Sequence, residues 1–247
     1  MPVHLVGIDC ATVASRIGLA FGRYDRGRLT VTQALFCPPS RPVSQFVAEM
    51  IRPAPGPVLL ALDAPLGWPA PLGSSLVNHQ AGEPLPAAAD AMFRRETDRF
   101  IHRTVGKLPL EVGADRIART AHAALNLLAE LSAALNQPIP LAWQPQLGDP
   151  LSAIEVYPAA TLTVHGLPAR NYKKGDQAAA RRAILAQLQP LMTLSADQGP
   201  LVDSADLLDA VVCLLAAADF LAGRVMPPTD RPLARREGWI WVRQPVG

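Results

Sequence analysis

Short apolar runs that end in an acidic residue mark two buried strands in this chain. Residues 3–8 are mostly apolar and are followed by Asp9, and residues 58–62 are followed in the same way by Asp63. Continuous apolar runs of this length are typical of strands that are covered on both faces of a sheet. A third run, at residues 153–157, has the same character. We therefore predict three buried strands, two of which carry an aspartate at the carboxyl end.

The segment after the first strand predicts a hairpin. Residues 16–24 and 29–36 are both rich in apolar positions, and the tight polar segment 25–28 joins them. Two such runs around a short turn favour antiparallel pairing, so strands one to three should form a meander. At the other end of the chain, residues 238–242 alternate tryptophan with aliphatic residues and predict a final short strand.

Helical spacing of apolar positions predicts five helices. Asp90 is placed to cap the second of them, Asp203 or Ser204 can cap the last, and Gly223 ends it. Residues 70–89 show no period and predict a long irregular loop, a type of segment that is often functional or mobile in compact domains. The predicted helices cover residues 43–51, 90–105, 115–136, 177–188 and 204–222.

The order of these elements predicts the fold class. A hairpin meander, a helix, a strand, further helices, a strand and a long helix follow one another in the order of the RNase H-like fold. We therefore predict an α/β protein with a mixed five-stranded sheet, an antiparallel three-stranded meander plus parallel strands, flanked by helices. No internal repeat or linker divides the chain, so residues 1–247 should form a single domain with a helical and loop insertion at about 66–150.

Composition narrows the class of protein. Of 247 residues, 49% are hydrophobic and 18% charged, which excludes a disordered chain, and the net charge of +2 is too small for a protein that coats DNA. Three scattered cysteines favour free thiols over a disulfide framework or a zinc site. The most apolar stretch, residues 207–222, is interrupted by Asp209 and Asp219, and an acid comes too early for a signal peptide. We expect a cytoplasmic protein with no membrane span.

Four aspartates should converge at one edge of the predicted sheet. Asp9 and Asp63 end strands that would be parallel neighbours, and ligands of open α/β sheets bind beyond such carboxyl ends. Asp206 and Asp209 lie three residues apart and project from one face of the last helix near its start. The helix dipole would keep Asp206 ionised. If this helix begins against the strand tips, all four carboxylates meet.

Converging carboxylates suit a divalent metal. Magnesium or manganese prefers hard oxygen ligands, and carboxylates this close repel one another strongly without a cation. Two ions about 4 Å apart can hold the attacking water and the leaving oxygen of a phosphodiester. The predicted metal ligands are therefore Asp9, Asp63, Asp206 and Asp209, with Mg²⁺ or Mn²⁺ as the cofactor and a nucleic acid as the partner.

Each acid also has a structural interpretation. An aspartate at the end of a strand is often a turn former, and Asp206 alone would be an ordinary acid of a first helical turn. Asp209 lies beside an apolar face and is harder to explain in this way. Glu155, inside the third apolar strand, could line the same site or could be a satisfied polar group on an edge. Glu237 is a weaker candidate of the same kind.

A series of motifs supports the acid set. The series resembles a bacterial and archaeal family of predicted RNase H-like nucleases that is catalogued as a domain of unknown function, and it extends from residue 7 to residue 242. The resemblance implies Asp9, Asp63, Asp206 and Asp209 as the acidic residues of the site. Asp206-x-x-Asp209-Ala210 is also similar to the last-helix motif of RuvC-type Holliday junction resolvases. Cys10 stands where many family members have glycine. The motifs are Gly7-Ile8-Asp9, Leu62-Asp63-Ala64-Pro65-Leu66-Gly67, Arg95-x-Thr97-Asp98, Glu155-Val156-Tyr157-Pro158, Asp206-Leu207-Leu208-Asp209-Ala210 and Glu237-Gly238-Trp239-Ile240-Trp241-Val242.

A basic stripe could contact the substrate. Arg95, Arg99 and Arg103 recur every four residues of a predicted helix and could follow a phosphate backbone. The alternative is a solvated face with local pairs to Glu96 and Asp98. Arg95 and Asp98 also belong to a family motif, and they could instead order the site as an ion pair across one turn.

Two aromatic segments leave similar alternatives. Tyr172, Lys173 and Lys174 form a compact basic and aromatic loop, which could contact phosphate or could be a surface turn. Trp239 and Trp241 lie on one strand face, where they could stack on bases or pack at the edge of the sheet.

The sequence is compatible with three functions. The first is a metal-dependent nuclease, with Glu155 as a further catalytic acid and Arg95, Asp98, Arg99 and Lys173 on the substrate side. The second is a phosphotransferase of the actin-like group, which needs two such domains and glycine-rich phosphate loops that this chain lacks. The third is a non-catalytic protein that uses the fold for binding.

Overall fold

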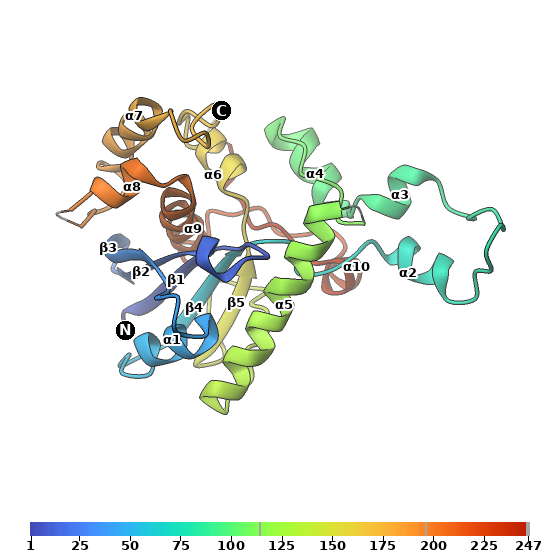
Figure 1. Ribbon diagram of the computed structural model, residues 1–247, viewed down its shortest axis with the longest axis horizontal. Coiled ribbons are helices and arrows are strands. Elements are labelled where there is room, and N and C mark those ends of the chain that lie inside the picture. The colour runs from blue at the N-terminus through green and yellow to red at the C-terminus, as the bar shows by residue number, and fades with distance from the viewer. Residues whose placement is uncertain (114, 196, 246–247) are drawn as a thin grey trace.

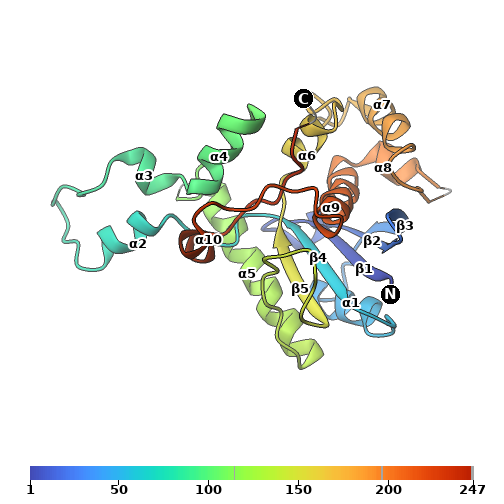
Figure 2. The ribbon, with the colours of Figure 1, turned by 180° about the vertical axis from the view of Figure 1, so that it is seen from behind.

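A mixed five-stranded sheet lies at the centre of the protein, and helices cover both of its faces (Figures 1 and 2). The computed structural model describes residues 1–113, 115–195 and 197–245. The strands are β1 (Val3–Asp9), β2 (Gly18–Asp25), β3 (Arg28–Phe36), β4 (Val58–Asp63) and β5 (Leu151–Glu155), and they lie in the order β3-β2-β1-β4-β5.

The strand directions confirm the predicted α/β fold class. β1, β2 and β3 form an antiparallel meander, and β4 and β5 extend the sheet parallel to β1. This mixed five-stranded arrangement is RNase H-like. In the register of β1 against β4, Asp9 lies opposite Asp63. Both aspartates therefore leave the sheet at the same level, at the carboxyl ends of neighbouring strands.

The two faces of the sheet have separate hydrophobic cores. On one face lies α9 (Ala205–Leu221), which contacts β1 to β4 and is buried along nearly its whole length. On the other face, α1 (Val43–Ile51) and α5 (Asp115–Leu135) pack against each other and against residues such as Ile8 and Leu60. The long helices and the buried strands predicted from apolar pattern are thus the elements that build the cores.

Two glycines allow α9 to approach the sheet closely. A Cβ on Gly7 of β1 would overlap the carbonyl oxygen of Ala210, and one on Gly18 of β2 would overlap the backbone of Asp206. Neither position can hold a side chain unless the helix moves away. This close approach brings the first turns of α9 to the carboxyl end of β1. Ser204 caps the helix there by accepting a hydrogen bond from the Leu207 amide at 3.3 Å.

The segment between β4 and β5, residues 64–150, contains several helices and is called the insertion below. The expected loop at residues 70–89 in fact begins with α2 (Ala70–Leu76), and the expected helix at 90–105 is two helices, α3 (Ala89–Phe93) and α4 (Glu96–Val105). The chain is extended at Arg94 and Arg95 between them, and Asp90 lies in the first turn of α3 rather than capping it. Figure 1 shows α2 and α3 projecting away from the sheet.

Several short helices were not predicted. They connect the longer elements and pack around α9 and the insertion. They are η1 (Ala14–Arg16), α6 (Pro158–Val164), α8 (Gly199–Asp203) and α10 (Arg231–Glu237). By contrast, α7 (Ala178–Leu188) matches the helix predicted at residues 177–188. In the part of the chain that the structure describes, no helix combines the length and the apolar character that a membrane crossing requires.

The predicted final strand at residues 238–242 is wrong. Only Ile240 forms an isolated bridge, to Glu155 at the edge of β5, and the Trp241 amide donates to the Glu155 carbonyl at 2.9 Å. Trp239 and Trp241 are buried, with ring centroids 4.9 Å from those of Phe100 and Phe220 respectively. The two tryptophans therefore pack in the core and are not available to stack on bases.

Candidate metal centre

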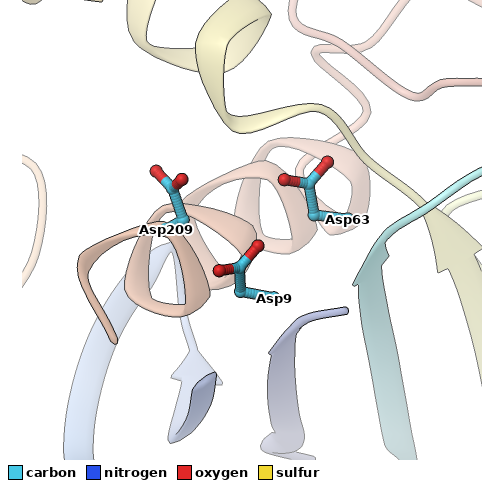
Figure 3. Close-up of side chains that lie close together, drawn as sticks. All are labelled: Asp9, Asp63 and Asp209. Carbon is cyan, nitrogen blue, oxygen red and sulfur yellow. The ribbon is translucent and has the colours of Figure 1, made fainter. Parts of the chain in front are cut away.

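Three of the four expected aspartates meet at one point. Asp9 comes from the end of β1, Asp63 from the end of β4 and Asp209 from α9 (Figure 3). One carboxylate oxygen from each lies within 4.8 Å of the other two. Asp209 is buried, whereas Asp9 and Asp63 are partly exposed. Figure 3 shows the three carboxylates around a common space at the strand tips.

Burial and mutual repulsion make this cluster electrostatically costly. Burial raises the pKa of Asp9 well above its usual value, and the charges of Asp63 and Asp209 raise it further. Burial also raises the pKa of Asp63 to about 7, although Lys173 opposes the shift. The pKa of Asp209 is raised by burial as well. Three acids that resist ionisation together are stabilised by a cation.

The fourth aspartate, Asp206, lies apart from this group. Its carboxylate is 3.8 Å from the Arg16 guanidinium, on the solvent side of the helix start. Its charge still adds to the raised pKa of Asp209, for which burial is the main cause. Asp206 is thus near the centre but outside the group of converging oxygens, because one helical turn separates it from Asp209.

Glu155 belongs to a buried ion-pair network. Its oxygens Oε1 and Oε2 accept from Arg95 Nη2 and Nη1 at 2.7 Å and 2.8 Å, and Oε2 also accepts from the Leu66 amide at 2.9 Å. Arg95 pairs in addition with Asp98 at 2.8 Å, so the ion pair expected across one turn is present. Both carboxylate oxygens of Glu155 are engaged, as the interpretation of a satisfied polar group requires. Glu155 also lines a cavity beside Asp9 and Asp63, so its role as a further catalytic acid stays a prediction.

The expected basic stripe does not form. Arg95 is the extended residue that precedes α4, with φ −79° and ψ 163°, so it does not share the helical spacing of Arg99 and Arg103 and is buried. Arg99 and Arg103 both pair with Glu96, at 3.2 Å and 2.8 Å. Arg99 and Arg103 thus have the local partners of the alternative, and contact of Arg99 with a substrate stays a prediction.

Glu237 has a structural position at two helix starts. Its carboxylate accepts from the Ala70 amide at 2.7 Å, at the beginning of α2, and from the Glu96 amide at 2.7 Å, at the beginning of α4. Unpaired amides at helix starts favour such an anion. Glu237 thus joins the C-terminal region to the insertion.

The loop that carries Tyr172 and Lys173 reaches into the acidic cluster. The Tyr172 hydroxyl donates to Asp209 Oδ1 at 2.7 Å, and Lys173 Nζ lies 2.6 Å from Asp209 Oδ2. The sequence predicted Lys173 as a substrate-binding residue but did not indicate the contact between Tyr172 and Asp209. The buried Arg181 of α7 holds the loop by donating to the carbonyls of Tyr172 at 2.7 Å and Lys174 at 2.8 Å.

A cavity of about 310 Å³ opens beside the aspartates at the strand tips. Its lining includes charged residues, among them Asp9, Asp63 and Lys173, and apolar residues such as Leu110 and Ile117. A substrate in this cavity would therefore meet both charged and apolar surface.

Comparison with known proteins places the chain in a family. The model of the family described as "Protein of unknown function (DUF429)" matches residues 7–233. The chain belongs to this family. All three converging aspartates lie within the matched residues. This assignment confirms the family resemblance that the sequence motifs indicated.

The chain was also compared with curated proteins and with solved structures. A search of the curated proteins found no significant match. Among solved structures, this member of the DUF429 family is similar to T. thermophilus RuvC in complex with a Holliday junction substrate, with 14% sequence identity and a TM-score of 0.37. The similarity covers 92% of this chain and 99% of that one.

Proposed function

We propose that this protein is a metal-dependent nuclease that hydrolyses phosphodiester bonds of nucleic acid. The observation that carries the proposal is the convergence of Asp9, Asp63 and Asp209 at the carboxyl ends of adjacent parallel strands. The RNase H-like strand arrangement favours a nucleic acid as substrate by analogy of fold. The cavity beside the aspartates is large enough to hold part of a nucleotide chain next to them.

The donor atoms fit Mg²⁺ or Mn²⁺. Within the described ranges, the group that could hold a metal consists of carboxylates alone. Cys10 lines the same cavity, but burial and the charges of Asp9 and Asp63 raise the pKa of its thiol well above the usual value, so it stays protonated. A set of hard oxygen donors without thiolate or imidazole selects a hard divalent ion.

The residues of the site would have different roles in the reaction. Asp9 and Asp63 would hold the ion, with Asp209 completing the set, and a bound ion would acidify a water and neutralise charge on the phosphate. Tyr172 orients Asp209 by donating to its Oδ1. Glu155 and Arg95 fix the backbone that follows Asp63, because the Leu66 amide donates to Glu155.

The test is metal-dependent cleavage by matched variants. Wild-type protein, Asp63→Asn and Asp209→Asn would be assayed with Mg²⁺ or Mn²⁺ against labelled DNA, RNA and hybrid substrates. We expect wild-type cleavage to need the metal and each variant to lose at least 100-fold in rate, because removing a group that stabilises transition-state charge costs this order of rate. Asp203→Asn, at an exposed aspartate just before α9, is the control and should cleave like wild type.

Two outcomes would contradict the proposal. Cleavage that persists in both variants would show a contaminating nuclease or a different site. Metal binding without cleavage of any substrate would favour the non-catalytic alternative, in which the fold serves for binding.

A further inference from the structure

Lys173, whose side chain is 57% exposed, brings a positive charge against the acidic centre from its solvent side. Its ammonium lies 2.6 Å from Oδ2 of Asp209, a carboxylate that is only 1% exposed. The other oxygen of Asp209 accepts from the Tyr172 hydroxyl. The Lys173 ammonium and the Asp209 carboxylate therefore form an ion pair at the acidic centre.

The position of Lys173 is built into the fold. Arg181 is buried and donates to the carbonyls on both sides of Lys173, those of Tyr172 and Lys174. The Tyr172 side chain is buried under the loop. Both neighbours of Lys173 are thus fixed, and its backbone is held where the side chain can reach the acids.

The other acids near the centre have partners of their own. Glu155 is paired with Arg95, and Asp206 with Arg16. Among the ion pairs of the described residues, none involves Asp9 or Asp63. Asp9 and Asp63 are therefore the acids of the centre without an ion pair of their own. Burial raises the pKa of both, and the charge of Lys173 lowers it.

The charge of the centre fits one divalent ion. The three converging carboxylates and the Lys173 ammonium leave a net charge of −2. One divalent ion makes the centre neutral, whereas two would leave an excess of +2 in a partly buried site, which burial opposes. Glu155, which could have balanced a second ion, is already paired with the buried Arg95 at 2.7 Å, and Asp206 lies outside the group of converging oxygens, 3.8 Å from the exposed Arg16.

We propose that the centre binds a single divalent ion through Asp9 and Asp63, supported by Asp209, and that Lys173 is a catalytic residue that replaces the second ion. This inference rests on the proposed nuclease function and revises the two-ion expectation drawn from the sequence. In hydrolysis, the oxygen of one water bonds to phosphorus and the bond from phosphorus to the leaving oxygen breaks. One proton of the water passes through solvent to the leaving oxygen. Lys173 keeps its protons and donates a hydrogen bond to a phosphate oxygen as negative charge develops there.

The first test counts ions without substrate. Mn²⁺ bound per chain would be measured by equilibrium dialysis and calorimetry, with electron paramagnetic resonance to detect coupling between two ions. We expect one Mn²⁺ per wild-type chain and no coupling. Two bound ions would overturn the inference but leave the nuclease proposal intact. No bound ion would overturn both.

The second test removes the charge of Lys173. In Lys173→Met we expect Mn²⁺ to bind at least tenfold more tightly, because a competing cation is gone, while the rate with saturating metal falls at least 100-fold. Lys174→Met removes the same charge from the neighbouring residue, which is also exposed but forms no ion pair with any described aspartate, and should change neither quantity. Lys173→Arg keeps the charge and should keep wild-type metal affinity. A Lys173→Met protein with the metal affinity and rate of Lys174→Met would overturn the inference.

Discussion

Asp63 has a raised pKa in the metal-free protein, and a bound cation would favour its ionised form. Burial is the main cause that raises its pKa from 3.8 to about 7, so the folded protein without metal binds a proton that the unfolded chain releases. Between these two pH values the folded state holds more protons than the unfolded state, and stability therefore falls as pH rises. A shifted carboxyl group contributes up to about 1.4 kcal/mol per pH unit in this window.

Because stability falls as pH rises in this window, the metal-free protein should be less stable at neutral than at acidic pH. We expect the free energy of unfolding in EDTA to fall by roughly 2–4 kcal/mol from pH 4 to pH 7 at Asp63. Urea denaturation at both pH values measures it. Asp63→Asn should remove the part of this dependence that Asp63 contributes, while Asp9 and Asp209, whose pKa values are also raised, keep theirs. Saturating Mg²⁺ should reverse the dependence because the ion needs ionised ligands. The same pH dependence of stability in wild type and in Asp63→Asn would show that the surroundings of Asp63 do not disfavour its ionised form.

The residues of the centre were predictable to different degrees. Asp9 and Asp63 could be predicted because a strand pattern fixes where a strand ends, and parallel neighbours end together. Asp209 could be predicted from its place beside an apolar helix face. The contact of Tyr172 with Asp209 could not, because it joins residues 37 positions apart and depends on Arg181 holding an irregular loop.

The spacing of apolar residues predicted the long helices and the buried strands but not the short helices. α2, α6, α8 and α10 have five to seven residues, too few to show a helical period. Each also has proline in its first two positions, where it is tolerated because its missing amide has no helical partner. A proline within a loop and a proline that begins a helix look alike in the sequence.

The buried network at the start of α4 should stabilise the junction of insertion and sheet. Arg95 joins Asp98 of α4 to Glu155 of β5, and all three side chains are buried. Removing one partner leaves buried charges unpaired, so we expect Arg95→Met to cost about 3–5 kcal/mol of unfolding free energy. Chemical denaturation measures this cost.

A matched surface pair tests whether burial is the cause. Arg103 pairs with Glu96 on the exposed side of the same helix. Arg103→Met should cost less than about 1 kcal/mol, since exposed pairs contribute little. Equal costs for the two arginine variants would show that the Arg95 network contributes no more than a surface pair.

The whole molecule assembles the centre from residues that are 200 positions apart, in β1 and α9. An ion that binds only the folded state therefore stabilises the entire structure around the sheet. At an ion concentration 100 times its dissociation constant, this stabilisation is about 2.7 kcal/mol. Amides that exchange only by global unfolding, such as those in the buried middle of α9, should then exchange about 100-fold more slowly.

Hydrogen exchange with and without Mg²⁺ can separate this linkage from a local effect. The projecting segment 76–86 is exposed throughout and exchanges by local opening, so the ion should leave its rate unchanged. Asp9→Asn should abolish the slowing in α9 while the segment 76–86 again stays the same. Slowing confined to the strand tips would mean that the ion does not stabilise the fold as a whole, because every globally exchanging amide must slow by the same factor when binding is linked to folding.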